Sequence, residues 1–352
     1  MPRTVGGKVP SKWRVADRAD GLAQLKQRLR DQEDGLVLNR IHTVDTWLDH
    51  WLDHVVKPSC RATTRESHAW IVQHYIRPTL GKKRLDKLTT PDVRGWVNDL
   101  ANRYAIETMK NAFRRLNTAL EVAVNDSLIR RNPCDGVTLP KGEQRQAIAL
   151  TEDQVGRLLH TANKNPILPL LVLAVSTGMR RGELLGLRWK NVTLDGPEPK
   201  IAIVEQLQIV DKKPALVPPK SKASKRDIPL DPTLVEILKH HQRAQLGRKA
   251  KLITRWIEHG LVFSSLRGTP IGGRNLGRTF SLLLGKAELP HIRFHDLRHT
   301  AGSLMLAAGV PMVDVSKLLG HSSVSVTASI YAHSYTENKR AAVAAVTKKL
   351  SL

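Results

Sequence analysis

Apolar residues in the first half of the chain recur at the spacing of an α-helix, and this pattern is what most restricts the fold. Between Ile41 and Val55 they stand three and four residues apart, which places them along one face of a helix. Three further segments with this period follow before Asn132 and Pro133, where a helix is expected to end. Four helices within about a hundred residues predict a compact helical domain.

Several helix starts carry a recognisable signal. Thr63 and Thr151 each precede a Glu or Gln by three residues, which is the spacing of a capping box. Thr90 followed by Pro91 predicts an N-cap and the first residue of another helix. The tryptophans at helical spacing are interpreted as core residues, in preference to platforms on which bases stack. They are Trp47, Trp51, Trp70 and Trp96.

Composition divides the rest of the chain into four more segments. Residues 1–40 are polar and charged with one short helical stripe, and are interpreted as an N-terminal arm or the remnant of a small module. The helical domain covers residues 41–134, and the polar, turn-rich residues 135–148 are expected to form a linker. A second domain covers residues 149–336, and residues 337–352 are a candidate tail helix with one apolar face.

The second domain is predicted to mix helices with a few strands. Strands are expected over residues 201–210, 215–218 and 227–230, with residues 220–226 as the turn between two of them. The chain is therefore expected to be mainly α and multidomain, with a mixed α+β second domain that holds a small antiparallel sheet. Helices are expected around residue 158 and over residues 168–176, 183–187, 232–245, 275–284, 297–308 and 313–319.

The charge of the chain indicates what it binds. Lys and Arg number 56 against 32 Asp and Glu, so the formal net charge is +24. Such an excess needs a polyanionic partner or strong solvation, and nucleic acid is the usual partner. A ribosomal or other basic protein without catalytic chemistry has the same composition, so composition alone does not separate these classes.

Cysteine content and hydropathy predict the compartment. The two cysteines, Cys60 and Cys134, are too few and too far apart for a disulfide framework or a zinc knuckle. The basic start leads into no apolar stretch, so no signal peptide is expected. The longest apolar run, residues 167–175, is too short to span a bilayer. A cytoplasmic protein that has no membrane partner is expected.

Short segments in the second half carry the residue types that metal-free chemistry on a phosphodiester needs. Arginine forks bind phosphate and stabilise the charge that grows on its oxygens. An attacking hydroxyl with a pKa near ~10 needs help to lose its proton, and the departing oxygen needs an acid. The segments are Thr-Gly-Met-Arg-Arg-Gly-Glu (177–183), Pro-Lys-Ser-Lys-Ala-Ser-Lys-Arg-Asp-Ile-Pro-Leu (219–230), His-Asp-Leu-Arg-His-Thr (295–300), Leu-Gly-His-Ser-Ser (319–323) and Ile-Tyr-Ala-His (330–333).

Each segment alone is weak, but their order and spacing resemble the signature of the tyrosine site-specific recombinases, the phage integrase family. The resemblance covers roughly residues 41–335. It implies a SAM-like, core-binding DNA-binding domain over residues 41–134 and a catalytic recombinase domain over residues 149–336. The implied activity is cleavage and rejoining of DNA through a 3′-phosphotyrosine, to integrate or excise a phage or mobile element.

The resemblance also implies roles for residues of the first two segments. The Thr-Gly-x-Arg-x-x-Glu pattern assigns Arg180 to the phosphate, with Glu183 as a supporting residue. The family's lysine lies in a turn before an Arg-x-x-Pro-Leu strand, and it protonates the leaving oxygen. Lys220 fits this position best, and Lys222 is the competing choice because the length of the turn varies.

The last three segments supply the remaining residues that the resemblance implies. His295 and Arg298 form the His-x-x-Arg pattern, and His321 lies in Leu-Gly-His. Arg298 and His321 would hold the phosphate, while His295 would either take the nucleophile's proton or position the phosphate. Tyr331, ten residues beyond His321, is the expected nucleophile, and Tyr335 is the poorer alternative.

Three other functions are compatible with parts of the pattern. His295, Asp296 and His299 resemble a zinc-binding His-Glu-x-x-His motif, with His321 as a third ligand. Arg298 on the same helix would repel a cation, so His299 is interpreted as a supporting residue and no metal is expected. A DNA-binding regulator without catalysis and a type IB topoisomerase are the other two alternatives.

The resemblance further implies the partners of the chain. These are double-stranded DNA with recombination core sites, and three further copies of the chain in a homotetramer on that DNA. A host DNA-bending protein or an excision factor is a further implied partner, and no cofactor is expected. Residues 337–352 pack either on their own domain or on a neighbouring subunit.

Overall fold

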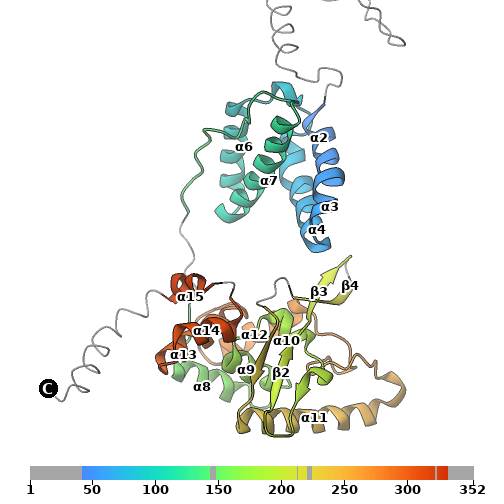
Figure 1. The fold of residues 1–352 in the computed structure, drawn as a ribbon, viewed down its shortest axis with the longest axis vertical. Helices are drawn as coiled ribbons and strands as arrows, with labels where there is room; N and C mark the ends of the chain where they lie inside the picture. Colours follow the sequence, from blue (N-terminus) through green and yellow to red (C-terminus); the bar gives the residue numbers. More distant parts are fainter. Residues whose placement is uncertain (1–41, 143–147, 212, 220–223, 322, 332–352) are drawn as a thin grey trace, which may run out of the picture. The chain divides into compact units, whose positions relative to one another are not determined.

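The computed structural model describes residues 42–331, except for residues 143–147, 212, 220–223 and 322. The chain divides into two compact units on either side of the bond between Gln144 and Arg145. Each unit is described by itself below and can be followed by its colours in Figure 1.

Residues 42–142, the described part of the N-terminal unit, form helices connected by turns and loops, with one isolated bridge (Figure 1). Its first two long helices each consist of two α-helical parts joined by a wider π-helical turn. The elements are α2 (Val44–Trp51), η1 (Leu52–Val56), α3 (Lys57–Ser59), α4 (Ala62–Ile71), η2 (Val72–Ile76), α5 (Arg77–Leu80), η3 (Leu85–Lys87), α6 (Thr90–Arg103) and α7 (Ile106–Asn125).

Proline explains the two π-helical turns. Pro58 is the second residue of α3, which follows η1, and Pro78 is the second residue of α5, which follows η2. A proline inside an α-helix has no N–H to donate, and its ring collides with the carbonyl four residues earlier. Widening the preceding turn relieves both problems, so each helix continues past its proline.

Two of the predicted helix starts are wrong by one or two residues. The residue before α4 is Arg61, and no side chain caps this helix, so Thr63 lies inside the first turn where it cannot serve as the cap. Thr89, not Thr90, caps α6: its hydroxyl accepts from Asp92 N, and the Asp92 carboxylate accepts from Thr89 N. With Thr89 as the cap, Pro91 lies in the first turn of α6. The backbone N–H groups of the first turn have no carbonyl partner within the helix, so a proline there removes no helical hydrogen bond.

The core of the N-terminal unit is built around three buried tryptophans. Trp47, Trp51 and Trp96 are at most 2% exposed, and Trp47 Nε1 donates to the carbonyl of Ala119 at 2.9 Å. Trp70 differs, since it is 51% exposed. The prediction of core tryptophans is therefore right for three positions and wrong for Trp70.

The C-terminal unit combines helices with short strands (Figure 1). Thr151 caps its first helix through the capping box with Gln154 that the sequence predicts. The elements are α8 (Glu152–Thr161), α9 (Leu168–Thr177), α10 (Arg181–Gly186), η4 (Trp189–Asn191), β1 (Val192–Thr193), β2 (Lys200–Ile203), β3 (Gln206–Val210), β4 (Lys213–Val217), β5 (Arg226–Pro229), α11 (Pro232–Leu252), η6 (Ile253–Arg255), α12 (Gly273–Lys286), α13 (Asp296–Ala307), α14 (Met312–Leu319) and α15 (Val324–Tyr331).

The strands form two small antiparallel sheets. One has the order β1-β2-β5, and the other is the hairpin of β3 and β4. The single strand predicted over residues 201–210 is therefore wrong, because it divides at Val204 and Glu205 between the two sheets. Glu205 accepts two hydrogen bonds from the Arg188 guanidinium, at 2.5 and 2.6 Å, and this pairing holds the break in place. The expected turn at residues 220–226 likewise connects strands of different sheets.

Helix α9 forms the centre of the C-terminal unit. It is apolar on all sides, and it packs against α8, α10, α11 and α13. Burial on every face explains why its sequence shows no polar stripe. Its contact with α13 brings the end of α9 beside Arg298, which is where the candidate site begins.

The described residues confirm the expected fold class, which is mainly helical with a helical unit followed by a mixed unit that holds small antiparallel sheets. None of the helices in this part of the chain has both the length and the apolar character that crossing a membrane requires.

Candidate active site

The site starts at Gly178, where α9 ends in a left-handed turn. The φ angle of Gly178 is +63°, and a Cβ atom at this position would lie 2.3 Å from Leu319 Cδ2. Glycine is therefore required twice, by the backbone angle and by the close approach of α14. The turn leaves the Gly178 carbonyl to accept from Arg298 Nη1 at 2.8 Å, and it places Arg180 as the extended residue before α10.

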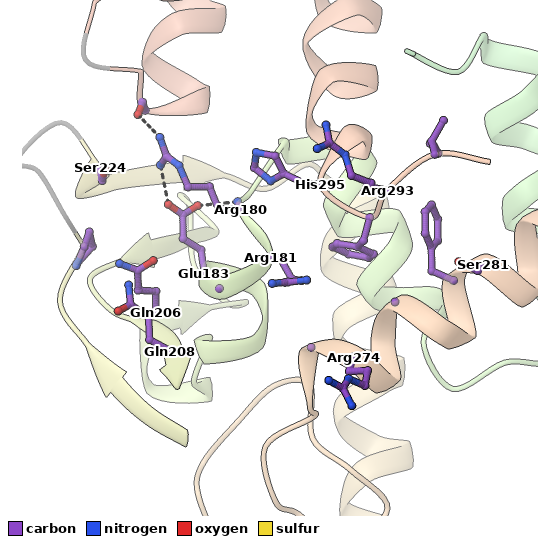
Figure 2. A pocket seen from close by; sticks show the side chains of 18 of the residues that line it. Arg180, Arg181, Glu183, Gln206, Gln208, Ser224, Arg274, Ser281, Arg293 and His295 are labelled. Carbon is purple, nitrogen blue, oxygen red and sulfur yellow. Dashed lines mark hydrogen bonds and ion pairs between the residues drawn. The ribbon is translucent and has the colours of Figure 1, made fainter. Parts of the chain in front are cut away.

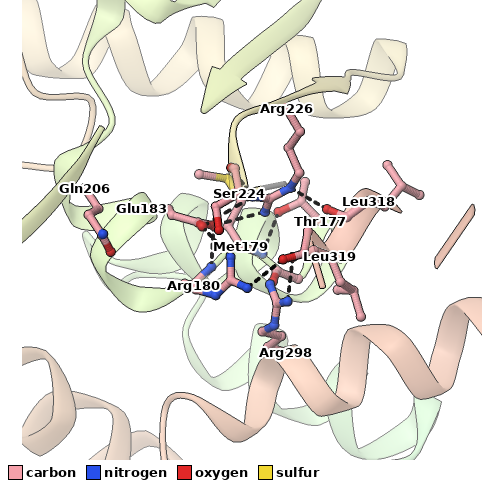
Figure 3. Close-up of polar contacts among 12 residues, drawn as sticks. Thr177, Met179, Arg180, Glu183, Gln206, Ser224, Arg226, Arg298, Leu318 and Leu319 are labelled. Atoms are coloured by element: carbon pink, nitrogen blue, oxygen red, sulfur yellow. Dashed lines mark hydrogen bonds and ion pairs between the residues drawn. The ribbon is translucent and has the colours of Figure 1, made fainter. Parts of the chain in front are cut away.

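Glu183 is a buried carboxylate that pairs with two arginines. It accepts from the backbone N and the Nη1 of Arg180, both at 2.9 Å, and from Arg226 Nη2 at 3.0 Å (Figure 3). Burial alone raises the pKa of Glu183, but the hydrogen bonds and charges of Arg226 and Arg180 outweigh it, and the pKa lies below its ordinary value. Glu183 is therefore ionised at neutral pH in the folded chain.

Three arginines from three different elements converge on the C-terminal end of α14 (Figure 3). The consecutive carbonyls of residues 318 to 320 accept from Arg226 Nε at 2.6 Å, Arg298 Nη2 at 2.5 Å and Arg180 Nη2 at 2.8 Å, in that order. The last carbonyls of a helix have no partner within the helix and carry its partial negative charge, so cations are stabilised there. This helix end thus positions all three guanidinium groups.

The exposure of these arginines differs, and this decides which of them reaches a ligand. The side chain of Arg226 is 7% exposed and Arg298 is 4% exposed, whereas the side chain of Arg180 is 31% exposed. Glu183 pairs with Arg180 and Arg226, and Arg298 adds a third guanidinium at the same helix end, so positive charge predominates among these four side chains. A phosphate is the kind of ligand that such a cluster binds well.

His321 connects this cluster to the helix that ends at Tyr331. It follows Gly320, the left-handed residue that ends α14, and its Nδ1 lies 2.8 Å from the hydroxyl of the fully buried Thr327 in α15. Desolvation, followed by the charges of Arg298 and Arg180, lowers the pKa of His321 to about 4. The imidazole is therefore neutral at pH 7 in the absence of DNA.

We expect the ring protons of His321 to titrate with a midpoint near 4 in the free protein, because a proton on this imidazole would face two arginines. An unfolded chain takes up this proton near 6.5, so His321 lowers the stability of the fold as the pH falls from 6.5 towards 4. NMR titration with a His321→Gln variant to assign the signal measures the midpoint. A midpoint near 6.5 would contradict this environment.

His295 is the residue directly before α13, and His299 lies in that helix next to Arg298. Their rings meet edge to face, with centroids 6.0 Å apart. Desolvation, then the charges of Arg298 and His299, lower the pKa of His295, and desolvation is also the largest cause of the lowered pKa of His299. His295 remains partly open to solvent and lines the cleft described below.

The side chain of Asp296 forms its hydrogen bonds with Arg293. The buried carboxylate accepts from Arg293 Nη2 at 2.9 Å and from Arg293 Nε at 3.2 Å. Hydrogen bonds from Arg293 outweigh the effect of burial and keep the pKa of Asp296 low. Across the described ranges, no three His, Cys, Asp or Glu side chains are grouped to hold a metal ion.

A cleft of about 970 Å³ opens beside the cluster (Figure 2). Arg180, Glu183 and His295 line it together with Gly320, while the β3 hairpin and the start of α12 form its other walls. The arrangement can therefore hold a phosphodiester against Arg180, with Arg298 and His321 behind it.

The structure brings together most of the residues that the sequence singles out. Arg180, Glu183, His295, Arg298, His299 and His321 are all near the C-terminal end of α14 or the start of α13. Tyr331 is the last residue of α15, which packs against α13 and α14. Lys220, Lys222 and Tyr335 lie outside the described residues, so their assignments stay predictions.

Sequence reasoning missed two residues of this site. In the sequence, Arg226 serves only to locate the Arg-x-x-Pro-Leu strand after the lysine, although it shares one face of β5 with the buried Ile228. Residues two apart in a strand point to the same face, so an arginine two residues before a buried isoleucine is expected to be buried with an acidic partner. This spacing is the signal that could have identified Arg226. Thr327 has no comparable signal in its sequence context.

Comparison with known proteins agrees with this geometry. Residues 149–338 match the phage integrase family, and residues 43–101 match the N-terminal SAM-like domain of phage integrases. An integrase of Streptomyces ambofaciens is 30% identical over 344 residues, which are 92% of this chain and 86% of that protein. A XerC-like tyrosine recombinase of Caldanaerobacter subterraneus is 29% identical over 317 residues, 85% of this chain and 80% of that protein.

Solved structures share the fold. The Tn1549 transposon integrase, in complex with a circular intermediate DNA, superposes with a TM-score of 0.72 at 22% identity and covers 87% of this chain and 99% of its own. A lambda integrase tetramer bound to a Holliday junction has a TM-score of 0.62 at 19% identity, with 89% of this chain and 87% of its own covered. Because the family match spans more than half of the chain and holds the whole arginine cluster, this protein belongs to the phage integrase family.

Proposed function

We propose that this chain recombines double-stranded DNA at specific sites, with Tyr331 as the nucleophile and the arginine cluster at the end of α14 as the phosphate-binding site. The observation that carries the proposal is the convergence of Arg180 and Arg298 on consecutive carbonyls beside His321. Integration or excision of a phage or mobile element is the task that such tyrosine recombinases perform. Trapping a covalent adduct on a nicked core site tests the proposal directly.

The cleavage step follows from the chemistry of these side chains. The Tyr331 hydroxyl oxygen attacks the scissile phosphorus, and the bond from phosphorus to the 5′ oxygen breaks. Arg180, Arg298 and His321 stabilise the charge that develops on the non-bridging oxygens. Lys220 gives a proton to the departing 5′ oxygen, which leaves as a hydroxyl.

Rejoining reverses this step with a different strand. The incoming 5′ hydroxyl attacks the 3′-phosphotyrosine and releases Tyr331, so the energy of the broken bond is kept and no ATP is needed. His295 has a lowered pKa and is mostly neutral at pH 7, a state in which it can accept the proton of the nucleophile. The same neutral ring can instead donate to the phosphate and position it, and both roles remain part of the proposal.

Lys220→Ala should cleave ordinary DNA slowly, because an unprotonated 5′ alkoxide is a poor leaving group. The same variant should recover on DNA with a bridging 5′-phosphorothiolate, whose sulfur leaves without a proton. Cleavage rates on the two substrates measure the effect. If Lys222→Ala is rescued in this way and Lys220→Ala is not, the general acid is Lys222.

Assembly on DNA extends the proposal. We infer a homotetramer on two core sites, acting in the cytoplasm, with residues 41–134 as core-binding domain and residues 149–336 as catalytic domain. Residues 1–40 serve as an N-terminal arm or as the remnant of an arm-binding module, and a host DNA-bending protein or an excision factor takes part. The lambda integrase tetramer on a Holliday junction, which shares this fold, supports the stoichiometry.

Deleting residues 337–352 should leave binding to a single core site nearly unchanged but weaken synapsis and recombination. The sequence of this segment has one apolar face, formed by Val343, Val346 and Leu350, which would dock on a neighbouring subunit. Native gels and strand-transfer assays compare the truncated chain with the full chain. Normal synapsis and recombination would show that the segment packs on its own domain or is dispensable.

A further inference from the structure

The cleft holds two cationic side chains that the catalytic arrangement does not use. Arg181 is the first residue of α10 and Arg274 lies in the first turn of α12, and both line the cleft and are exposed (Figure 2). Within the described part of the chain, neither guanidinium forms an ion pair or a hydrogen bond. Both charges are therefore available to a ligand in the cleft.

Adjacent arginines in the sequence reach different places because the backbone changes conformation between them. Arg180 is extended and directs its guanidinium to Glu183 and to the end of α14, whereas Arg181 is already helical. The guanidinium of Arg181 reaches across to α12: a Cβ at Gly273 would lie 3.4 Å from its Cζ and 3.5 Å from its Nε. The guanidinium of Arg181 therefore lies close to the start of α12, one residue before Arg274.

Two like charges at one end of a cleft repel each other unless an anion lies between them. Arginine forks match the oxygens of a phosphate, and two of them can share one phosphate group. The cleft of about 970 Å³ also has room for more than one phosphate. A DNA strand presents a negative charge about every 3.4 Å along the helix axis, so a strand held at Arg180 brings further phosphates nearby.

We propose that Arg181 and Arg274 form a second phosphate subsite, which binds a DNA backbone phosphate flanking the scissile phosphate. This inference rests on the proposed function, because it takes Arg180 to hold the scissile phosphate. Holding two phosphates of the backbone sets the position of the scissile one relative to the nucleophile. Arg181 and Arg274 are thus positioning residues that contact the substrate away from the reacting atoms.

The test combines arginine variants with DNA neutralised at one phosphate at a time. A set of core sites carries a single uncharged methylphosphonate at each phosphate around the cleavage position. Arg181→Gln should weaken binding of unmodified DNA roughly tenfold and lower the slope of log affinity against log salt by about one unit. Arg274→Gln should act in the same direction, and Arg243→Gln, an exposed arginine of α11 outside the cleft, serves as the matched control.

The decisive result is the coupling between protein and DNA changes. In the wild type, one methylphosphonate flanking the scissile phosphate should weaken binding by more than Arg181→Gln alone, because it removes the contacts of both arginines. In Arg181→Gln and in Arg274→Gln, the same methylphosphonate should cause a smaller loss than in the wild type, because one arginine still contacts that phosphate, while Arg243→Gln should respond like the wild type. If the methylphosphonate at every position weakens binding equally in the wild type and in the three arginine variants, the proposed subsite is wrong.

Failure of the subsite and failure of the proposed function are distinguishable in the same samples. A covalent adduct through Tyr331 in the wild type, together with no coupling at Arg181 or Arg274, rejects the subsite alone. Arg181→Lys separates charge from geometry: it should retain the salt slope but bind less tightly than arginine, because an ammonium group lacks the planar fork. If Arg181→Lys lowers the slope of log affinity against log salt as much as Arg181→Gln does, the proposed subsite is also wrong.

Discussion

Tyr331→Phe should form no covalent protein–DNA adduct on a nicked or suicide core site, while it binds the site as the wild type does. Phenylalanine keeps the ring but lacks the hydroxyl oxygen that attacks phosphorus, so cleavage has no nucleophile. Arg180 and Arg298, which are proposed to contact the phosphate, belong to other elements and keep their hydrogen bonds to the end of α14. Denaturing gels measure the adduct, and gel-shift titration measures the binding.

Tyr335→Phe is the matched control, because Tyr335 is the alternative nucleophile four residues further along the chain. This variant should still form the adduct. An adduct that persists in Tyr331→Phe and disappears in Tyr335→Phe would show that Tyr335 is the nucleophile. Absence of an adduct in the wild type on such a suicide site, despite tight binding, would contradict the recombinase mechanism itself.

Arg226→Gln should lower the free energy of unfolding of the C-terminal unit by about 3 kcal/mol, because it leaves part of the buried charge of Glu183 uncompensated. Glutamine also cannot reproduce the bond of Arg226 Nε to the carbonyl of residue 318, so the end of α14 should lose its alignment with Arg180. Cleavage should therefore fall together with stability. Denaturant titration measures the first effect, and adduct formation measures the second.

The double variant Arg226→Gln/Glu183→Gln separates charge from simple loss of packing. Removing both partners also removes the buried carboxylate, so the double variant should regain about 1–2 kcal/mol relative to Arg226→Gln. Arg243→Gln, exposed on α11, should change stability by no more than about 0.5 kcal/mol. Additive losses from Arg226→Gln and Glu183→Gln would mean that the two charges do not stabilise each other.

Local patterns explain how much of the fold was predictable. The helical period between Ile41 and Val55, the capping box of Thr151 with Gln154 and the apolar run that became α9 all depend on residues within one or two turns of each other. Such signals act before any tertiary contact forms, so the sequence alone determines them. The order of the chemical segments likewise determined the family, because that order is a property of the chain itself.

Predictions went wrong where a distant segment decided the outcome. The helical spacing of apolar residues correctly predicts that Trp70 lies on a helix. Whether another helix covers that face of the helix depends on tertiary packing, and Trp70 is in fact 51% exposed. The strand predicted over residues 201–210 divides because β2 pairs with β5 while β3 pairs with β4. A pattern of alternating residues does not record which partner each half of a strand will have.

The site shows the same division between sequence and tertiary structure. The sequence by itself predicted that Arg180, Arg298 and His321 take part in phosphate chemistry. Only the folded chain decided that they meet at one helix end, and that Arg226 joins them by a hydrogen bond to a carbonyl 92 residues away. The unpaired carbonyls at the end of α14 select these arginines through hydrogen bonds and helix charge, and that selection exists only after α9, α13, α14 and β5 have packed together.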